Sequence, residues 1–140
     1  MKSDTMVMYR DAYFKDCEAL IESNHPYRNH VNKFIEYLNL PEVNLADTPM
    51  DISKETVKGC VGYYHEKGEI NSRKTMESHL ESVKSFYDYL SRTGKLRDIF
   101  SDLDYGEFKE TIVQMYNLSE PSGRGVFGCN DIQKILLNLD

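Results

Sequence analysis

The sequence lacks any long run of apolar residues. A membrane-spanning helix needs roughly 18 or more consecutive apolar residues, and no stretch of this chain approaches that length. The first residues, Met1 to Met6, also lack the apolar core of a signal peptide. We therefore expect a cytoplasmic protein that makes no contact with a membrane.

The sequence also has few residues that carry catalytic or metal chemistry. Its three cysteines, Cys17, Cys60 and Cys129, are an odd number, lie far apart and have no partner at metal-ligand spacing. There is no glycine-rich phosphate loop and no nucleophile–base motif. This pattern predicts reduced cysteines, with Cys60 in the core. It also predicts a chain that is not an enzyme by itself and uses no metal, cofactor or small-molecule substrate.

A basic excess, the usual mark of a nucleic-acid-binding protein, is missing as well. The formal net charge is −6, which argues against phosphate binding. The charge is unevenly distributed, because residues 71–97 carry six basic and three acidic side chains whereas both ends are acidic. This local excess is typical either of a nucleic-acid contact or of an ordinary solvated helix face.

What the sequence does have is helical periodicity. The chain is 140 residues long and 40% hydrophobic, with six Phe and ten Tyr, which is enough for one packed domain. No segment alternates as a strand does, and no Asn-Gly or Asp-Gly hairpin signal is present. We predict an all-α protein folded as a compact bundle of four to five helices.

Apolar residues recur at three- and four-residue spacing in successive segments. These segments are residues 7–21, 27–40, about 54–66, 73–92, 105–117 and 130–139. Ser53 and Ser72 are predicted N-caps, since a serine hydroxyl accepts the free backbone N–H groups of a first helical turn. Gly59 and Gly62 lie inside the third segment, where each costs up to ~1 kcal/mol relative to Ala. They indicate either the close approach of another backbone or local flexibility.

The predicted buried stripe of the first segment consists of Tyr9, Tyr13, Cys17 and Leu20. Residues 1–25 are interpreted as a helical extension that precedes the main domain at 26–118. Pro, Ser and Gly concentrate at 119–128, which reads as a linker. The apolar segment in 129–140 is too short to be a complete unit.

Residues 34–96 resemble the N-terminal core-binding domain of tyrosine recombinases, the phage integrase family. Four pieces carry the resemblance in order: Phe34 to Leu38, Ile52 to Val57 with Tyr63 to Gly68, Asn71 to Met76, and Leu80 to Leu90 with Thr93 to Leu96. The segment Cys129 to Leu136 resembles the entry of that family's catalytic domain. Two features depart from the family pattern: Arg97-Asp98 stands where Asn-Pro is usual, and the helix at 105–117 lengthens the linker region.

The resemblance implies a SAM-like helical fold that clamps double-stranded DNA together with other recombinase subunits, while catalysis resides in a following C-terminal domain. The family's catalytic Arg, Lys, His-x-x-Arg, further His or Trp, and nucleophilic Tyr have no counterpart here. His25-Pro26-Tyr27-Arg28 spells His-x-x-Arg, but it lies at a proline turn before the core-binding segment. We assign it no catalytic role, and we expect no catalytic residue in this chain.

The start of the helix at 73–92 is the best candidate for a DNA contact. An exposed N-terminal turn offers backbone N–H groups, hydroxyls and cations to a phosphate. The candidates are Asn71, Ser72, Arg73, Lys74 and Thr75 at this turn, with Arg73 and Lys74 foremost, then His79 and Lys84 near the same side, and Lys54, Thr56 and Lys58 on the preceding helix. Capping, packing or simple solvation is the ordinary structural explanation for each of them.

Two other classes of function stay open. A helical protein–protein interaction module without DNA binding is favoured by the negative net charge and by the apolar segment at 130–139. A small enzyme is disfavoured by the missing motifs.

Overall fold

The structure is a computed structural model, and it describes residues 5–23 and 25–118. Those residues form six α-helices, one 3₁₀ turn and no strand, so the all-α prediction is confirmed. The elements are α1 (Met6–Asp16), α2 (Glu18–Ser23), α3 (His25–Leu38), η1 (Pro49–Asp51), α4 (Lys54–Glu66), α5 (Arg73–Arg92) and α6 (Tyr105–Tyr116). None of these helices combines the length and the apolar character of a membrane span. The predicted linker at 119–128 and the segment at 129–140 lie outside the described residues.

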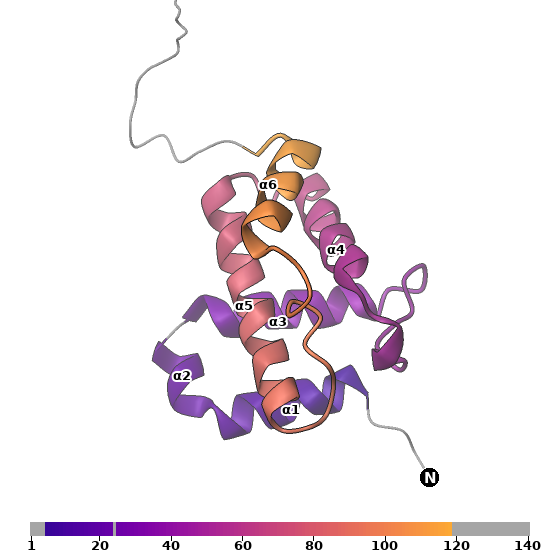
Figure 1. The fold of residues 1–140 in the computed structure, drawn as a ribbon, viewed down its shortest axis with the longest axis vertical. Helices are drawn as coiled ribbons and strands as arrows, with labels where there is room; N and C mark the ends of the chain where they lie inside the picture. Colours follow the sequence, from indigo (N-terminus) through magenta and orange to yellow (C-terminus); the bar gives the residue numbers. More distant parts are fainter. Residues whose placement is uncertain (1–4, 24, 119–140) are drawn as a thin grey trace, which may run out of the picture.

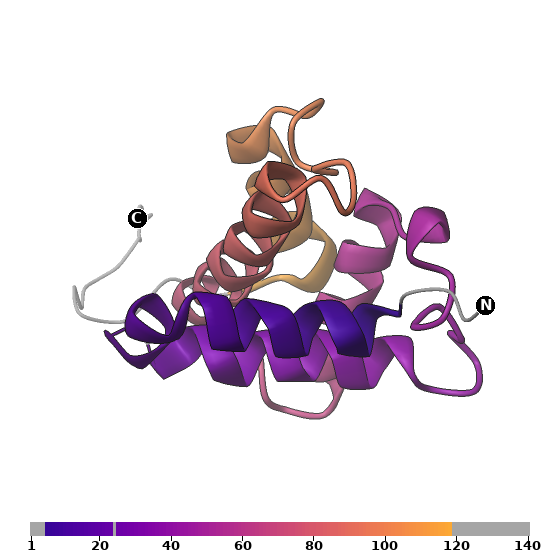
Figure 2. The same cartoon turned by 90° about the horizontal axis from the view of Figure 1, so that it is seen from below.

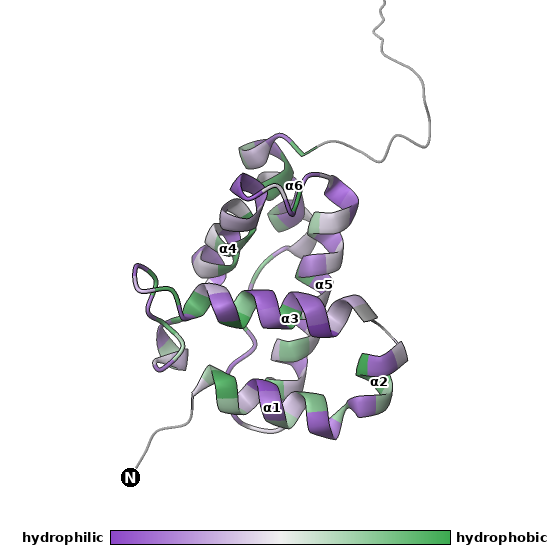
Figure 3. Cartoon of the chain, turned by 180° about the vertical axis from the view of Figure 1, so that it is seen from behind, coloured by the Kyte–Doolittle hydropathy of each residue, from purple (hydrophilic) through white to green (hydrophobic). Residues whose placement is uncertain are grey.

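The core forms where α5 crosses α3 (Figure 1). Hydrophilic and hydrophobic residues alternate along α3, which lies in front of α5 when the molecule is seen from behind (Figure 3). The apolar residues of the two helices meet, as their periodicity predicts. The fully buried side chains are Val31, Phe34, Ile35 and Leu38 of α3 and Met76, Leu80, Val83, Phe86, Tyr87 and Leu90 of α5. Each large apolar side chain buried in this way contributes roughly 1.5–3 kcal/mol.

The N-terminal helices complete the same core. α1 runs antiparallel to α3, and α2 makes the turn between them (Figures 1 and 2). Met6, Tyr13 and Ile21 are fully buried. Two hydrogen bonds join α1 to α5: the Tyr13 hydroxyl lies 2.9 Å from Ser85 Oγ, and the Tyr89 hydroxyl donates to Asp16 Oδ2 at 2.6 Å. Residues 5–23 therefore share the hydrophobic core of the helices that follow.

The first predicted helix is in fact two helices. It breaks at Cys17, whose φ of −117° and ψ of 35° are not helical. The break shifts the buried stripe, so that Ile21 is buried while Leu20 is 40% exposed, and Tyr9 and Cys17 are only half-buried. The prediction of one continuous helix was wrong because a single non-helical residue leaves the average spacing of apolar residues almost unchanged. The described chain consequently has six α-helices rather than four to five.

Capping and turn residues place the start of α5. Gly68 adopts a left-handed φ of +80° just after α4, a conformation that costs glycine little. Ser72 is the N-cap as predicted, and its Oγ accepts the Thr75 N–H at 3.2 Å. Ser53 likewise precedes α4 as its N-cap. The helix predicted at 73–92 therefore begins and ends where the sequence indicated.

The two glycines of α4 accept tyrosine side chains against the helix. A Cβ atom at Gly59 would lie 2.5 Å from the Tyr37 hydroxyl oxygen, and one at Gly62 would lie 2.4 Å from that of Tyr116. The Tyr116 hydroxyl donates to the Lys58 carbonyl at 3.1 Å, which fixes α6 against α4. Tyrosine side chains, and not the backbone that the sequence suggested, make the close approach to both glycines.

Candidate nucleic-acid interface

The predicted DNA-contacting residues of α5 point in three directions. Arg73 faces α6, where its guanidinium pairs with Glu77 at 3.1 Å and with Glu110. The same pairing lowers the pKa of the Glu110 carboxyl. Lys84 lies on this side as well, with its Nζ 5.3 Å from the centre of the Tyr105 ring. Both cations therefore contact α6, and the charge of Arg73 is matched by carboxylates.

Lys74 and Thr75 lie on the opposite side of the same turn, against α3. They help to form the α3–α5 groove, an open depression of about 480 Å³ between the first turns of the two helices. Its lining residues are Pro26, Asn29, His30, Lys74, Thr75 and Ser78. This groove gathers an amide, two hydroxyls and a cation at the positive ends of two helix dipoles.

The α3–α5 groove has no carboxylate among its described lining residues and contains one available cation. That cation is Lys74, which is exposed and makes no ion pair with a described residue. Seven of the other thirteen described cations contact a carboxylate: Arg10, Lys33, Lys58, Arg73, Arg92, Arg97 and Lys109. An anion entering this groove would meet an available ammonium group and no fixed negative charge.

His79 does not reach the surface, so the prediction that it contacts DNA is wrong. It is 0% exposed, and its Nδ1 lies 3.1 Å from Nδ1 of His30 while its Nε2 lies 3.6 Å from Sγ of Cys60. The physical reason is its register, since position 79 falls beside Met76 and Leu80 on the buried face of α5. Burial lowers the pKa of both imidazoles and raises that of the Cys60 thiol, as expected for groups withdrawn from water.

The candidates on α4 do not join the α5 cluster. Lys58 pairs with Glu55 at 3.1 Å, and the Thr56 hydroxyl accepts the Ser53 N–H at 3.2 Å. Lys54 is exposed. The depression that Lys54, Glu55 and Lys58 line also contains the carboxylates Asp102, Asp104 and Glu107. A phosphate approaching this end of α4 would meet more negative than positive charge.

The remaining two candidates shape the turn before α5. Asn71 Nδ2 donates to the Gly68 carbonyl at 2.7 Å, and Ser72 Oγ lies 3.1 Å from Thr75 Oγ1. Asn71 is nevertheless exposed. Their structural roles are therefore to close the α4–α5 turn and to cap α5, which presents Lys74 to the solvent.

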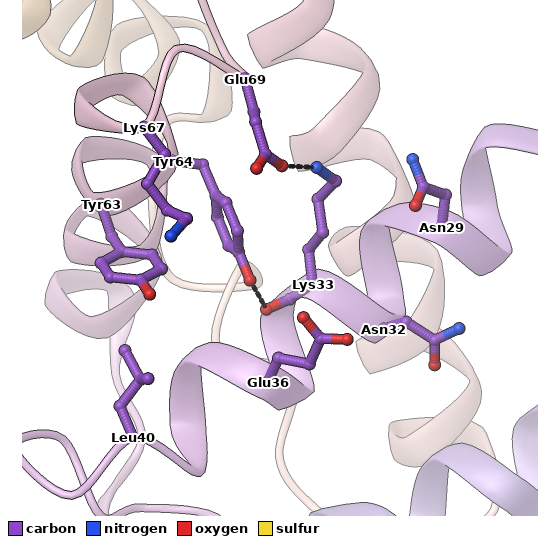
Figure 4. A pocket seen from close by; sticks show the side chains of 9 residues that line it. All are labelled: Asn29, Asn32, Lys33, Glu36, Leu40, Tyr63, Tyr64, Lys67 and Glu69. Carbon is purple, nitrogen blue, oxygen red and sulfur yellow. Dashed lines mark hydrogen bonds and ion pairs between the residues drawn. The ribbon is translucent and has the colours of Figure 1, made fainter.

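A second depression, the α3–α4 groove, contains polar residues that the sequence reading did not single out. It has a volume of about 300 Å³, and its lining residues are Asn29, Asn32, Lys33, Glu36, Leu40, Tyr63, Tyr64, Lys67 and Glu69 (Figure 4). Asn29 lines both grooves, so they adjoin along α3. The sequence pattern that could have indicated this groove is the polar stripe of α3. Asn29, Asn32 and Glu36 recur there at helical spacing, opposite the apolar stripe.

No protein-family model matches this chain, and comparisons with curated proteins and with solved structures find no similar protein. Within the described part of the chain, no three His, Cys, Asp or Glu side chains gather in a way that would hold a metal ion. A function therefore has to be inferred from the chain's own surface.

Proposed function

We propose that this chain is the DNA-binding, core-binding domain of a tyrosine recombinase, with catalysis residing in a further domain. The α3–α5 groove is the observation that carries the proposal. It combines the positive ends of two helices with Lys74, Thr75 and Ser78, and it has no carboxylate among its described lining residues. Helix N-termini, hydroxyls and lysines are the groups that contact DNA phosphates.

The arrangement of helices is consistent with this proposal. The pieces that resemble the recombinase family lie in α3, α4, α5 and the turns between them, and α3 crosses α5 so that their first turns flank one groove. A duplex lying across that groove would be held by its phosphate backbone. The exposed amide of Asn29 lines this groove, and asparagine amides are among the side chains that contact base edges.

The net charge of −6 shapes the expected affinity. Phosphate contacts supply most non-specific affinity, and each one contributes to the salt dependence of binding. With this net negative charge the chain should bind a short duplex weakly, with a dissociation constant on the order of micromolar at low salt. Tighter binding would then need the remainder of a DNA clamp.

The test uses the whole chain, a short fluorescein-labelled duplex and fluorescence anisotropy at low and moderate salt. Lys74→Gln should weaken binding several-fold and reduce the slope of log K against log salt by about one phosphate contact. Lys95→Gln is the matched control, because Lys95 is an exposed lysine beyond the other end of α5 and its substitution changes the net charge equally. Circular dichroism should show an unchanged fold for both.

The proposal fails if the wild-type chain does not bind DNA at low salt, or if Lys74→Gln and Lys95→Gln weaken binding equally. The first outcome favours the other candidate, a helical protein-interaction module. That alternative is supported by the ion pairs that engage seven of the fourteen described cations and by Met50, which is 81% exposed.

A further inference from the structure

The α3–α4 groove adjoins the proposed DNA site and contains cations of its own. Figure 4 shows Lys33 reaching across the groove to Glu69, with Tyr64 beneath and Asn29 and Asn32 along the α3 wall. The Tyr64 hydroxyl donates to the Lys33 carbonyl at 2.8 Å. This hydrogen bond ties α4 to α3, so the two walls of the groove are held in a fixed relation.

Two ammonium groups line this groove, but they differ in availability. Lys67 is exposed, lies with its Nζ 5.3 Å from the centre of the Tyr63 ring, and makes no ion pair with a described residue. Lys33 is only 20% exposed and donates to Glu69 Oε1. Its Nζ also lies 5.0 Å from the centre of the Tyr64 ring. The groove therefore contains one accessible cation and one that is covered by a carboxylate.

The carboxylate that covers Lys33 is easily exchanged. Glu69 belongs to the turn between α4 and α5, and its side chain is 40% exposed. The hydrogen bond from Lys33 lowers the pKa of the Glu69 carboxyl, yet an ion pair that is open to water adds little stability. A phosphodiester offers the same kind of acceptor as a carboxylate. The Lys33 ammonium also faces the Tyr64 ring, a second contact that does not involve the Glu69 carboxylate.

We propose that the α3–α4 groove is a second phosphate-binding point for the same DNA duplex, with Lys67 and Lys33 as its cations and Glu69 as an autoinhibitory contact. In the free protein the Glu69 carboxylate is paired with the Lys33 ammonium group. On the DNA the phosphodiester replaces Glu69, whose carboxylate moves to water. Glu36, the other carboxylate of the groove, is exposed on α3 and has no described ion pair. This inference rests on the proposed function, because it assigns a further contact to the same partner.

The deciding variant is Glu69→Gln, which removes the competing charge and keeps the side-chain shape. We expect it to bind the labelled duplex about two- to fivefold more tightly than wild type at low salt, since a weak ion pair no longer has to open. Its salt slope should be steeper by up to about one phosphate contact. Glu66→Gln is the matched control, because Glu66 is also exposed, ends α4 and lines neither groove. A Lys33→Gln substitution added to Glu69→Gln should abolish the gain.

Each outcome decides a separate point. If wild type binds DNA but Glu69→Gln and Glu66→Gln have equal affinities, or if the gain survives in the double variant, the second phosphate point is wrong while the proposed function stands. If none of these proteins binds DNA at low salt, the proposed function and this inference fall together. Thermal unfolding of each variant shows whether a change in affinity reflects a loss of fold.

Discussion

At the scale of single residues, the buried pair of His30 and His79 makes the fold sensitive to acid. Burial lowers the pKa of both imidazoles in the folded protein, whereas an exposed histidine in the unfolded chain titrates near ~6.5. Below that pH the unfolded chain binds protons that the folded protein does not, so acid favours unfolding. The stability that folding gains by keeping these imidazoles neutral is fully present above a pH of ~6.5. This contribution is lost as the pH falls towards about 4, the pKa of His30 in the folded protein.

We expect the free energy of unfolding to fall by about 2 kcal/mol per histidine between about pH 7 and pH 5. Urea unfolding at a series of pH values measures this loss. The variant His79→Gln removes one of the two titrating groups, so its free energy of unfolding should depend less steeply on pH. Its free energy of unfolding at neutral pH should be lower than that of the wild type. Equal pH dependence in the variant and the wild type would show that the pair does not control acid stability.

At the scale of elements, the packing of α6 on α4 depends on the absence of a side chain at Gly62. A Cβ atom there would lie 2.7 Å from Cζ and 2.8 Å from Cε1 of the Tyr116 ring. A contact this short forces the ring away and breaks the hydrogen bond from Tyr116 to the Lys58 carbonyl.

Gly62→Ala should therefore destabilise the protein by about 1–3 kcal/mol, although alanine is the better helix former by up to ~1 kcal/mol. In a Tyr116→Ala background the same substitution should become neutral or stabilising, because the ring is gone. Gly106→Ala is the control, since the nearest atom to its added Cβ lies at an ordinary 3.5 Å. Chemical unfolding of the four variants measures whether each substitution raises or lowers the free energy of unfolding. Destabilisation by Gly62→Ala that persists without the Tyr116 ring would contradict this account.

At the scale of the whole molecule, the N-terminal helices are part of the core rather than an appendage to it. Met6, Tyr13 and Ile21 are buried to 1% exposure or less. Tyr13 also packs on Phe86 and Tyr89 of α5, with ring centres 5.2 and 5.3 Å apart. Removing α1 and α2 would expose the apolar surface that these side chains cover on α3 and α5.

A chain that starts at Pro26 should consequently lose several kcal/mol of stability, since each large apolar side chain contributes roughly 1.5–3 kcal/mol. We expect a broad thermal transition and binding of a hydrophobic dye, in contrast to cooperative unfolding of the whole chain. Tyr13→Ala in the whole chain should also lower the free energy of unfolding, by about 3–5 kcal/mol. A truncated chain that unfolds as cooperatively as the original would mean that residues 5–23 are dispensable.

Much of the fold was predictable because its signals are local. α5 begins after a serine cap, ends before Gly94, and repeats apolar residues at helical spacing between them, and all of these lie within a few positions of one another. Cys60 was correctly placed in the core for the same reason. The break at Cys17 was not predictable, because the chain around it keeps a helix-like average pattern and only the packing of α1 and α2 around α3 and α5 selects the turn.

The sequence by itself determined which segments are helical and which face of α3 and α5 is buried, since covalent neighbours within one or two turns dictate both. Only the tertiary structure decided which charges remain available on the surface. Arg73 and Lys74 are adjacent, yet α6 brings Glu110 to the first while α3 brings only uncharged groups beside the second. The charge state of a surface depends on side chains that are distant in the chain, and no local pattern contains that information.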